Sequence, residues 1–125
     1  KRGFNVLGVD PARNLVEKAN DAGVHTLRCY FDNDFASSIA DKRGKAKLIL
    51  ANNCLAHIDD LAGVFRGVAT LLAEEGVFVF EVQHLAQQLR QGIVDNFYHE
   101  HLDYHNLEPL DSFAHRAAGL RIFDV

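Results

Sequence analysis

A short aromatic and polar segment near the carboxyl end of the sequence is the strongest candidate for chemistry. Residues 97–105 contain three histidines, two acids and two tyrosines. Tyr98, Glu100 and His101 could form an acid–base group, in which the carboxylate orients a neighbouring histidine and raises its basicity. A solvated polar loop is the alternative without chemistry.

The same segment allows a metal site. Its side chains alternate in type, so an extended backbone would align four of them as ligands on one side. These ligands would be His99, His101, Asp103 and His105. Composition alone leaves the acid–base group, the metal site and the solvated loop open.

A second polar group follows the apolar run that ends at Asn52 and Asn53. His57 comes four residues after Asn53, so one turn of helix would place both side chains on the same side. A lone histidine is most often structural. A histidine paired with an asparagine at the end of a strand is better placed to contact a ligand.

Two acids follow the first two apolar runs. Asp10 ends the run Phe4–Val9, where a carboxylate could accept hydrogen bonds from ribose hydroxyls or could cap the helix that begins near Pro11. Phe31 and Asp32 follow the second run and could flank an adenine ring, or could form a polar turn and helix cap.

The apolar pattern predicts the elements that position these residues. Runs rich in β-formers predict strands at 4–9, 25–31, 46–53, 77–82 and 121–125. Helical spacing predicts helices at 11–22, 34–40, 61–72, 85–93 and 110–117, with a break at 74–76 and no regular structure at 96–106.

This alternation predicts an α/β fold. Continuous apolar strands separated by helices indicate a mostly parallel sheet with helices on both faces. In such sheets ligands bind at the carboxyl ends of the strands. The polar residues at those ends, and the segment 97–105 that comes after the fourth predicted strand and its helix, are therefore the candidate site residues.

Composition restricts the function classes. The length of 125 residues suits one domain or part of one, and the net charge of −4 with scattered basic residues argues against a nucleic-acid binder. No apolar run reaches the roughly 20 residues that span a bilayer, and no signal peptide is visible. Cys29 and Cys54 lie in apolar runs, which predicts buried reduced thiols and a cytoplasmic location.

Four segments together resemble the sugar C-methyltransferase family, whose members use S-adenosylmethionine to methylate nucleotide-linked deoxysugars. The similarity covers most of the chain and is most specific in the Tyr-x-Glu-His tract. The segments are LANNCLAHI at 50–58, GVFVFEVQ at 76–83, NFYHEH at 96–101 and AGLRIFDV at 118–125.

The resemblance implies a Rossmann-like class I methyltransferase fold and a role for each site residue. Cofactor-binding residues would be Asp10 at the ribose, Phe31 and Asp32 near adenine, and Asn52. Substrate-facing catalytic residues would be Asn53, His57, Tyr98, Glu100 and His101. The resemblance also disfavours the metal site.

The implied reaction suits these residues. A ketone in the sugar allows a base to remove a proton from the adjacent carbon, which gives a nucleophilic enolate. His101, oriented by Glu100, is the candidate base, and Tyr98 could share or replace that role. His57 and Asn53 are suitable donors to the enolate oxygen.

We expect residues 1–125 to be part of a methyltransferase domain, because the first predicted strand begins almost at Lys1. The first strand with its glycine-rich loop and the C-terminal part of the domain would then be absent. The alternatives are a metal-dependent hydrolase and a non-catalytic nucleotide-binding relative. The particular sugar, the methylated carbon and the oligomeric state cannot be predicted.

Overall fold

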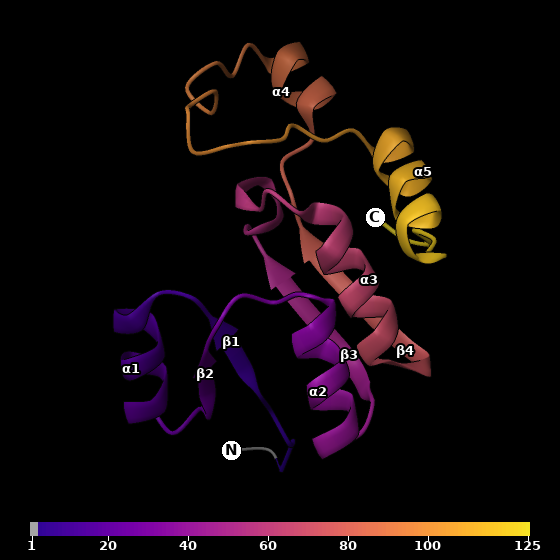
Figure 1. The fold of residues 1–125 in the computed structure, drawn as a ribbon. Helices are drawn as coiled ribbons and strands as arrows, with labels where there is room; N and C mark the ends of the chain where they lie inside the picture. The colour runs from indigo at the N-terminus through magenta and orange to yellow at the C-terminus, as the bar shows by residue number, and fades with distance from the viewer. Residues whose placement is uncertain (1–2) are drawn as a thin grey trace.

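The computed structural model describes residues 3–125 and alternates strands with helices (Figure 1). The first half contains β1 (Gly8–Asp10), α1 (Arg13–Asp21), β2 (Thr26–Arg28), α2 (Asn33–Arg43) and β3 (Ala46–Asn52). The second half contains the 3-10 turn η1 (Leu55–His57), α3 (Leu61–Leu71), β4 (Leu72–Glu81), α4 (Leu85–Gln91) and α5 (Leu107–Ala118). The α/β alternation is therefore confirmed.

The strands form two parallel pairs. β1 pairs with β2, so that Asp10 lies opposite Arg28, and β3 pairs with β4, so that Asn52 lies opposite Glu81. Within residues 3–125 no ladder joins β1 to β3, so the predicted single sheet is observed as two two-stranded sheets. Both pairs are parallel, as predicted.

Helix α3 forms the centre of the core. Its start is fixed by Asp60, whose carboxylate accepts a hydrogen bond from the backbone of Gly63 at 2.8 Å. Phe65 is 1% exposed and meets Phe78, Phe80 and Phe113 edge-on, with ring centroids 5.9, 6.3 and 5.8 Å away. Burying such a ring stabilises the fold by about 1.5–3 kcal/mol, and it ties α3 to both β4 and α5.

The predicted cover on both faces of the sheet is not found at β3 and β4. Alternate side chains of a strand point to opposite faces, and Ile49 and Ala51 pack toward α3. On the other face Leu48, Leu50 and Val79 are 54%, 62% and 47% exposed. The described helices therefore cover only one face of this pair, although the continuous apolar sequence predicts two.

The amino-terminal strands are shorter than predicted. The run at 4–9 forms a strand only at Gly8–Asp10, and Phe4 is 80% exposed. The run at 25–31 forms a strand only at Thr26–Arg28. Among residues 3–125, β1 and β2 pair with each other alone, in a ladder of three residue pairs.

The sequence also places two boundaries wrongly around α3 and at the end of the chain. β4 starts at Leu72 directly after α3, and the break predicted at residues 74–76 is a register shift in its ladder, between the pairs Ala46–Leu72 and Leu48–Val77. Residues 121–125 form no strand. They have no ladder partner among the described residues, and Asp111 of α5 holds them by accepting a hydrogen bond from the backbone of Ile122 at 2.8 Å.

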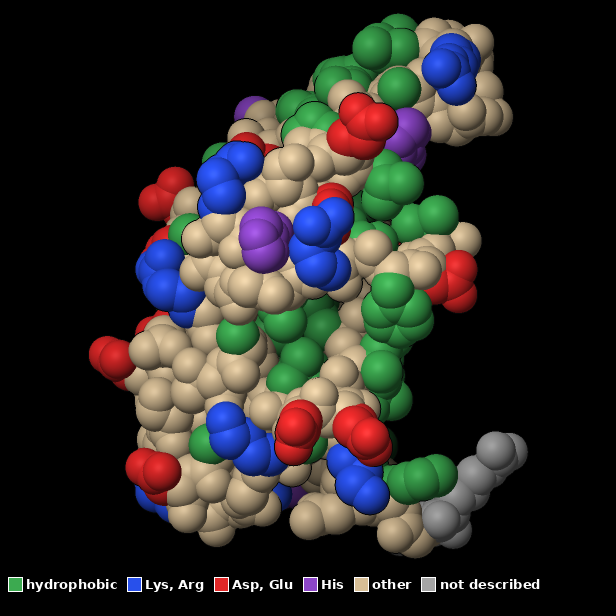
Figure 2. Space-filling view, turned by 90° about the vertical axis from the view of Figure 1, so that its right-hand side faces the viewer, with side chains coloured by type: hydrophobic (Ala, Val, Ile, Leu, Met, Phe, Trp, Pro, Cys, Tyr) green, Lys and Arg blue, Asp and Glu red, His purple; other side chains and the backbone are tan. Residues whose placement is uncertain are grey.

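A groove of about 860 Å³ runs along β4, between α5 and the chain end. Figure 2 shows hydrophobic side chains gathered in a hollow on this side of the molecule. Among residues 3–125, no helix is both long enough and apolar enough to cross a bilayer.

Candidate functional site

The site begins where β3 ends. Asn53 follows the strand with a left-handed backbone (φ 49°), and its backbone N–H donates to the carbonyl oxygen of Glu81 at 3.1 Å. Asparagine tolerates this conformation better than most residues. The turn directs the chain into η1, which carries His57 at its end.

The segment after α4 returns to η1 and brings the second polar group to the first. The backbone N–H of Leu102 donates to the carbonyl oxygen of Ala56 at 2.8 Å, and Nδ1–H of His57 donates to the carbonyl oxygen of Glu100, also at 2.8 Å. The rings of His57 and His101 lie 4.8 Å apart between centroids. Residues more than 40 positions apart in the sequence are thus neighbours.

Tyr98 and His101 form a hydrogen-bonded pair. The phenolic oxygen of Tyr98 lies 2.8 Å from Nε2 of His101, and their ring centroids are 4.2 Å apart. Tyr104 supports the pair, because its hydroxyl donates to the carbonyl oxygen of Tyr98 at 3.3 Å and its ring meets His101 edge-on at 5.7 Å. Phe97 stacks on Tyr104 with centroids 4.9 Å apart.

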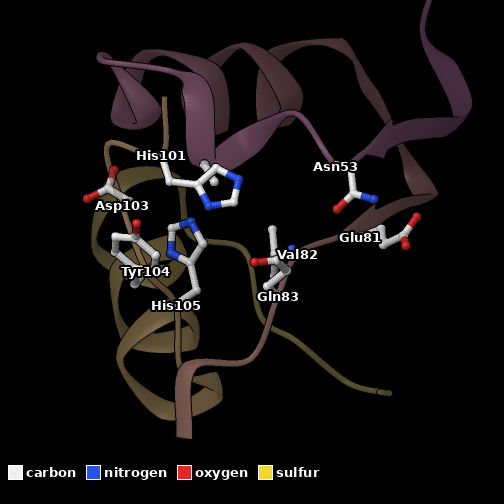
Figure 3. A pocket seen from close by; sticks show the side chains of 9 residues that line it. Asn53, Glu81, Val82, Gln83, His101, Asp103, Tyr104 and His105 are labelled. Atoms are coloured by element: carbon white, nitrogen blue, oxygen red, sulfur yellow. The ribbon is translucent and has the colours of Figure 1, made fainter. Parts of the chain in front are cut away.

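A small cavity of about 20 Å³ lies beside this pair (Figure 3). It connects the end of β3 with the returning segment, since both Asn53 and His101 line it. Further lining side chains come from Gln83, Asp103, Tyr104 and His105. Hydrogen bonds and ring contacts therefore bring His57, Tyr98 and His101 together, and Asn53 lines the same cavity as His101.

Glu100 contributes to this arrangement through its backbone. Its carbonyl oxygen holds His57, whereas its side chain is exposed to solvent. Among the described residues, the hydrogen-bonding partner of the His101 ring is the hydroxyl of Tyr98. The orienting role that the sequence suggests for the Glu100 carboxylate is performed here by Tyr98.

His105 also lines this cavity. The spacing of residues in the sequence does not predict that position. It is 9% exposed, and burial is the main cause that lowers its pKa below the usual value. The nearby His101 lowers the pKa further, and Asp103 acts in the opposite direction. The ring is therefore neutral near pH 7. The sequence suggested His105 only as a metal ligand.

Glu81 and Gln83 also line the cavity, and neither is among the site residues predicted from the sequence. Glu81 is the last residue of β4, so its place at a strand end is a signal that could have identified it, as for Asp10 and Asn53. No comparable signal marks Gln83. Its side chain is fixed by the buried Gln88, whose Nε2 donates to Oε1 of Gln83 at 2.7 Å.

Asp10 ends β1 in the place expected for a ribose-binding residue. Its Oδ1 accepts a hydrogen bond from the backbone of Ala12 at 2.7 Å, which fixes the carboxylate at the turn into α1. The charge of Asp10 contributes to raising the pKa of Cys54, after burial as the main cause. Asp10 therefore lies near the end of β3.

Phe31 and Asp32 have structural contacts. Asp32 caps α2 by accepting a hydrogen bond from the backbone of Phe35 at 2.8 Å. Phe31 packs against α3 at Gly67, where an added Cβ would lie 3.0 Å from the Phe31 ring. Asn52 is exposed at the end of β3.

Cys29 and Cys54 are free thiols, half-buried rather than fully buried. Burial raises the pKa of both, and Asp32 adds to this effect at Cys29. A raised pKa keeps a thiol protonated and unreactive at neutral pH.

The alternating ligand set does not form. Within residues 3–125 no three His, Cys, Asp or Glu side chains lie close enough together to hold a metal ion. His99 is exposed to solvent, and His101 and His105 line the cavity. The geometry gives no support to the metal-dependent hydrolase.

Comparison with known proteins assigns the family. Residues 1–125 match the family model described as a methyltransferase domain. The chain is also 42% identical over 123 residues to the C-methyltransferase NovU of Streptomyces niveus. The aligned region is 98% of this chain and 29% of that relative. The resemblance stated from the sequence is confirmed, and the chain belongs to the methyltransferase-domain family.

Proposed function

We propose that the protein transfers a methyl group from S-adenosylmethionine to a carbon atom of a nucleotide-linked deoxysugar, next to a ketone. The observation that carries this proposal is the hydrogen-bonded pair of Tyr98 and His101 beside His57, at the carboxyl end of β3. The 42% identity to a C-methyltransferase supports carbon as the acceptor atom.

Asp10 fits the ribose of the cofactor. Its Oδ1 is held by Ala12, and within the described residues Oδ2 makes no hydrogen bond, so that it can accept one from a ribose hydroxyl. Asn52, Phe31 and Asp32 are proposed as further cofactor contacts. When bound, S-adenosylmethionine would supply an electrophilic methyl group, whose bond to sulfur breaks as the new carbon–carbon bond forms, with S-adenosylhomocysteine as the leaving group.

Tyr98 and His101 act together as the acid–base group. Removing a proton from the carbon next to a ketone requires a base with a pKa near the working pH. Because the Tyr98 oxygen and Nε2 of His101 are 2.8 Å apart, a proton accepted by either group can be shared along this bond. Tyr98 is 40% exposed, so its side chain is open to a substrate.

His57 and Asn53 are proposed to hold the enolate oxygen. The amide of Asn53 can donate directly. His57 already donates from Nδ1 to Glu100, because a carbonyl oxygen can only accept. Its Nε2 can therefore donate to the enolate only when the ring is an imidazolium, which would add a positive charge where negative charge develops.

The test uses the full-length protein with a nucleotide-linked 4-keto deoxysugar and S-adenosylmethionine. We expect His101→Ala to abolish methylation while the affinity for the cofactor, measured by calorimetry, is retained. Unchanged turnover in this variant would remove His101 as the base. Cofactor binding without methylation by the wild-type protein would instead favour a non-catalytic relative.

A further inference from the structure

The imidazole of His105 is buried on a fixed backbone. Its segment forms a parallel bridge with His84, and its carbonyl oxygen accepts a hydrogen bond from the backbone of Leu85 at 2.8 Å. The next residue, Asn106, accepts a hydrogen bond from the backbone of Ala86 at 2.9 Å. The start of α4 therefore fixes the position of the ring.

Nε2 of this ring has no hydrogen-bonding partner among residues 3–125. The side chain is nine-tenths buried, and Nε2 itself is inaccessible to solvent. A buried polar atom without a partner loses its hydration without compensation, so such atoms are rare in folded proteins. An unpaired Nε2 beside a cavity indicates that the cavity has an occupant.

The cavity matches one oxygen atom with its hydrogens. Its volume of about 20 Å³ exceeds the 10–15 Å³ that one water requires. Asn53, Gln83 and His101 also line it, so the wall of the cavity carries polar side chains that can pair with an occupant. Figure 3 shows His101 and His105 side by side in this cavity.

We propose that His105 and this cavity form a binding site for a single hydroxyl oxygen next to His101. A hydroxyl can both donate and accept, so it can pair with Nε2 in either tautomer of the ring. The lowered pKa of His105 agrees with this role, because it keeps the imidazole neutral and able to accept.

The oxygen atom bound at this site differs between the ligand-free protein and the substrate complex. In the ligand-free protein it is a water molecule. In the substrate complex it is a hydroxyl of the sugar, a step that rests on the proposed function. His105 would then select substrates, because a site built around a buried polar group rejects an analogue that lacks the matching hydroxyl.

Crystals of the full-length protein without ligand decide whether the site exists. We expect an ordered water within about 3.2 Å of Nε2 of His105. An empty cavity, or a His105 ring whose Nε2 hydrogen-bonds a protein group instead, overturns the proposal. This result does not depend on whether the protein methylates sugars.

Crystals and calorimetry with thymidine diphosphate glucose decide the source. If a sugar hydroxyl replaces the water, His105→Leu should weaken binding of this probe at least tenfold, and the matched exposed variant His99→Leu should not. If the water stays and both variants bind the probe as the wild type does, the site holds water alone and the role of His105 in substrate selection is overturned. A displaced water with no oxygen in its place contradicts the proposal.

A second variant distinguishes loss of the binding site from loss of the fold. His105→Gln keeps a donor and an acceptor at the site, so it should fold where His105→Leu does not. We expect it to retain the ordered oxygen and most of the affinity for the probe. Loss of the oxygen in a folded His105→Gln protein counts against the site.

Discussion

The phenolic oxygen of Tyr98 lies 2.8 Å from Nε2 of His101, and the backbone N–H of His101 returns to the carbonyl oxygen of Tyr98 at 3.1 Å. The short turn between them therefore holds both rings in one place. Neither group changes its hydrogen bonding without affecting the other. The two should behave in kinetics as one unit.

Removing the hydroxyl of this pair should slow the reaction. For Tyr98→Phe we expect kcat to fall about 100-fold or more, the size usual for an acid–base group. The double variant with His101→Ala should be little slower than the worse single variant, because groups acting as a unit are not additive. Exchange of the carbon-bound proton in deuterated water measures this step without methyl transfer.

The control for these kinetics is His99→Ala, which alters the same segment at an exposed side chain. It should exchange the proton at the wild-type rate. Independent losses that multiply in the double variant would show that Tyr98 and His101 do not act together.

Asp10 should be required for cofactor affinity. Asp10→Ala removes both the ribose acceptor and the bond to Ala12, so we expect binding of S-adenosylmethionine to weaken at least tenfold, which corresponds to about 1.4 kcal/mol. Asp10→Asn keeps an acceptor for Ala12 and loses only the charge and one acceptor, so its loss should be smaller. Calorimetry showing equal affinity for Asp10→Ala and the wild type would exclude Asp10 as a cofactor residue.

His105 should make the fold sensitive to acid. Burial lowers the pKa of its imidazole in the folded state, while the unfolded chain keeps a value of about 6.5. Below that pH the unfolded chain binds a proton that the folded protein does not. The free energy of unfolding should therefore fall as pH decreases from about 6.5 toward the folded pKa, by at most about 1.4 kcal/mol per pH unit.

Chemical denaturation at several pH values measures this dependence. Between pH 7 and 5, the His105→Leu variant should lose this pH dependence of the free energy of unfolding. The His99→Leu variant should keep it. Equal slopes in the wild type and in His105→Leu would mean that His105 titrates normally.

Gly67 should tolerate no side chain. Alanine usually stabilises the interior of a helix relative to glycine by about 1 kcal/mol. Here a Cβ would lie 2.8 Å from the carbonyl oxygen of Asp32, so the backbone around α2 must shift. We expect Gly67→Ala to lower the free energy of unfolding by about 1–3 kcal/mol. A gain in stability in thermal unfolding would show that α2 and α3 pack less closely.

The elements that depend on local pattern could be predicted from the sequence. α3 follows from its apolar spacing and the cap at Asp60, and β3 from a continuous apolar run. The ends of β1 and the absence of a strand at 121–125 could not be predicted. A strand is defined by its partners, and the local sequence does not show whether a partner is present.

In the candidate site, too, some positions could be predicted from the local sequence and others could not. Asn53 could be assigned to the site because it follows a predicted strand, and ligands bind at the carboxyl ends of parallel strands. The contact between Tyr98 and His101 and the burial of His105 depend on how an irregular segment returns to η1. Such a path has no periodicity from which it could be predicted.

The most direct test of the central claim is the identity of the atom that receives the methyl group. The full-length protein is incubated with a nucleotide-linked 4-keto deoxysugar and cofactor carrying a ¹³C-labelled methyl group, and the product is examined by carbon NMR. We predict a labelled methyl group bonded to the carbon next to the ketone, and no labelled product from His101→Ala. Label on a sugar oxygen, or full labelling by the His101→Ala variant, would contradict carbon methylation by the Tyr98–His101 pair.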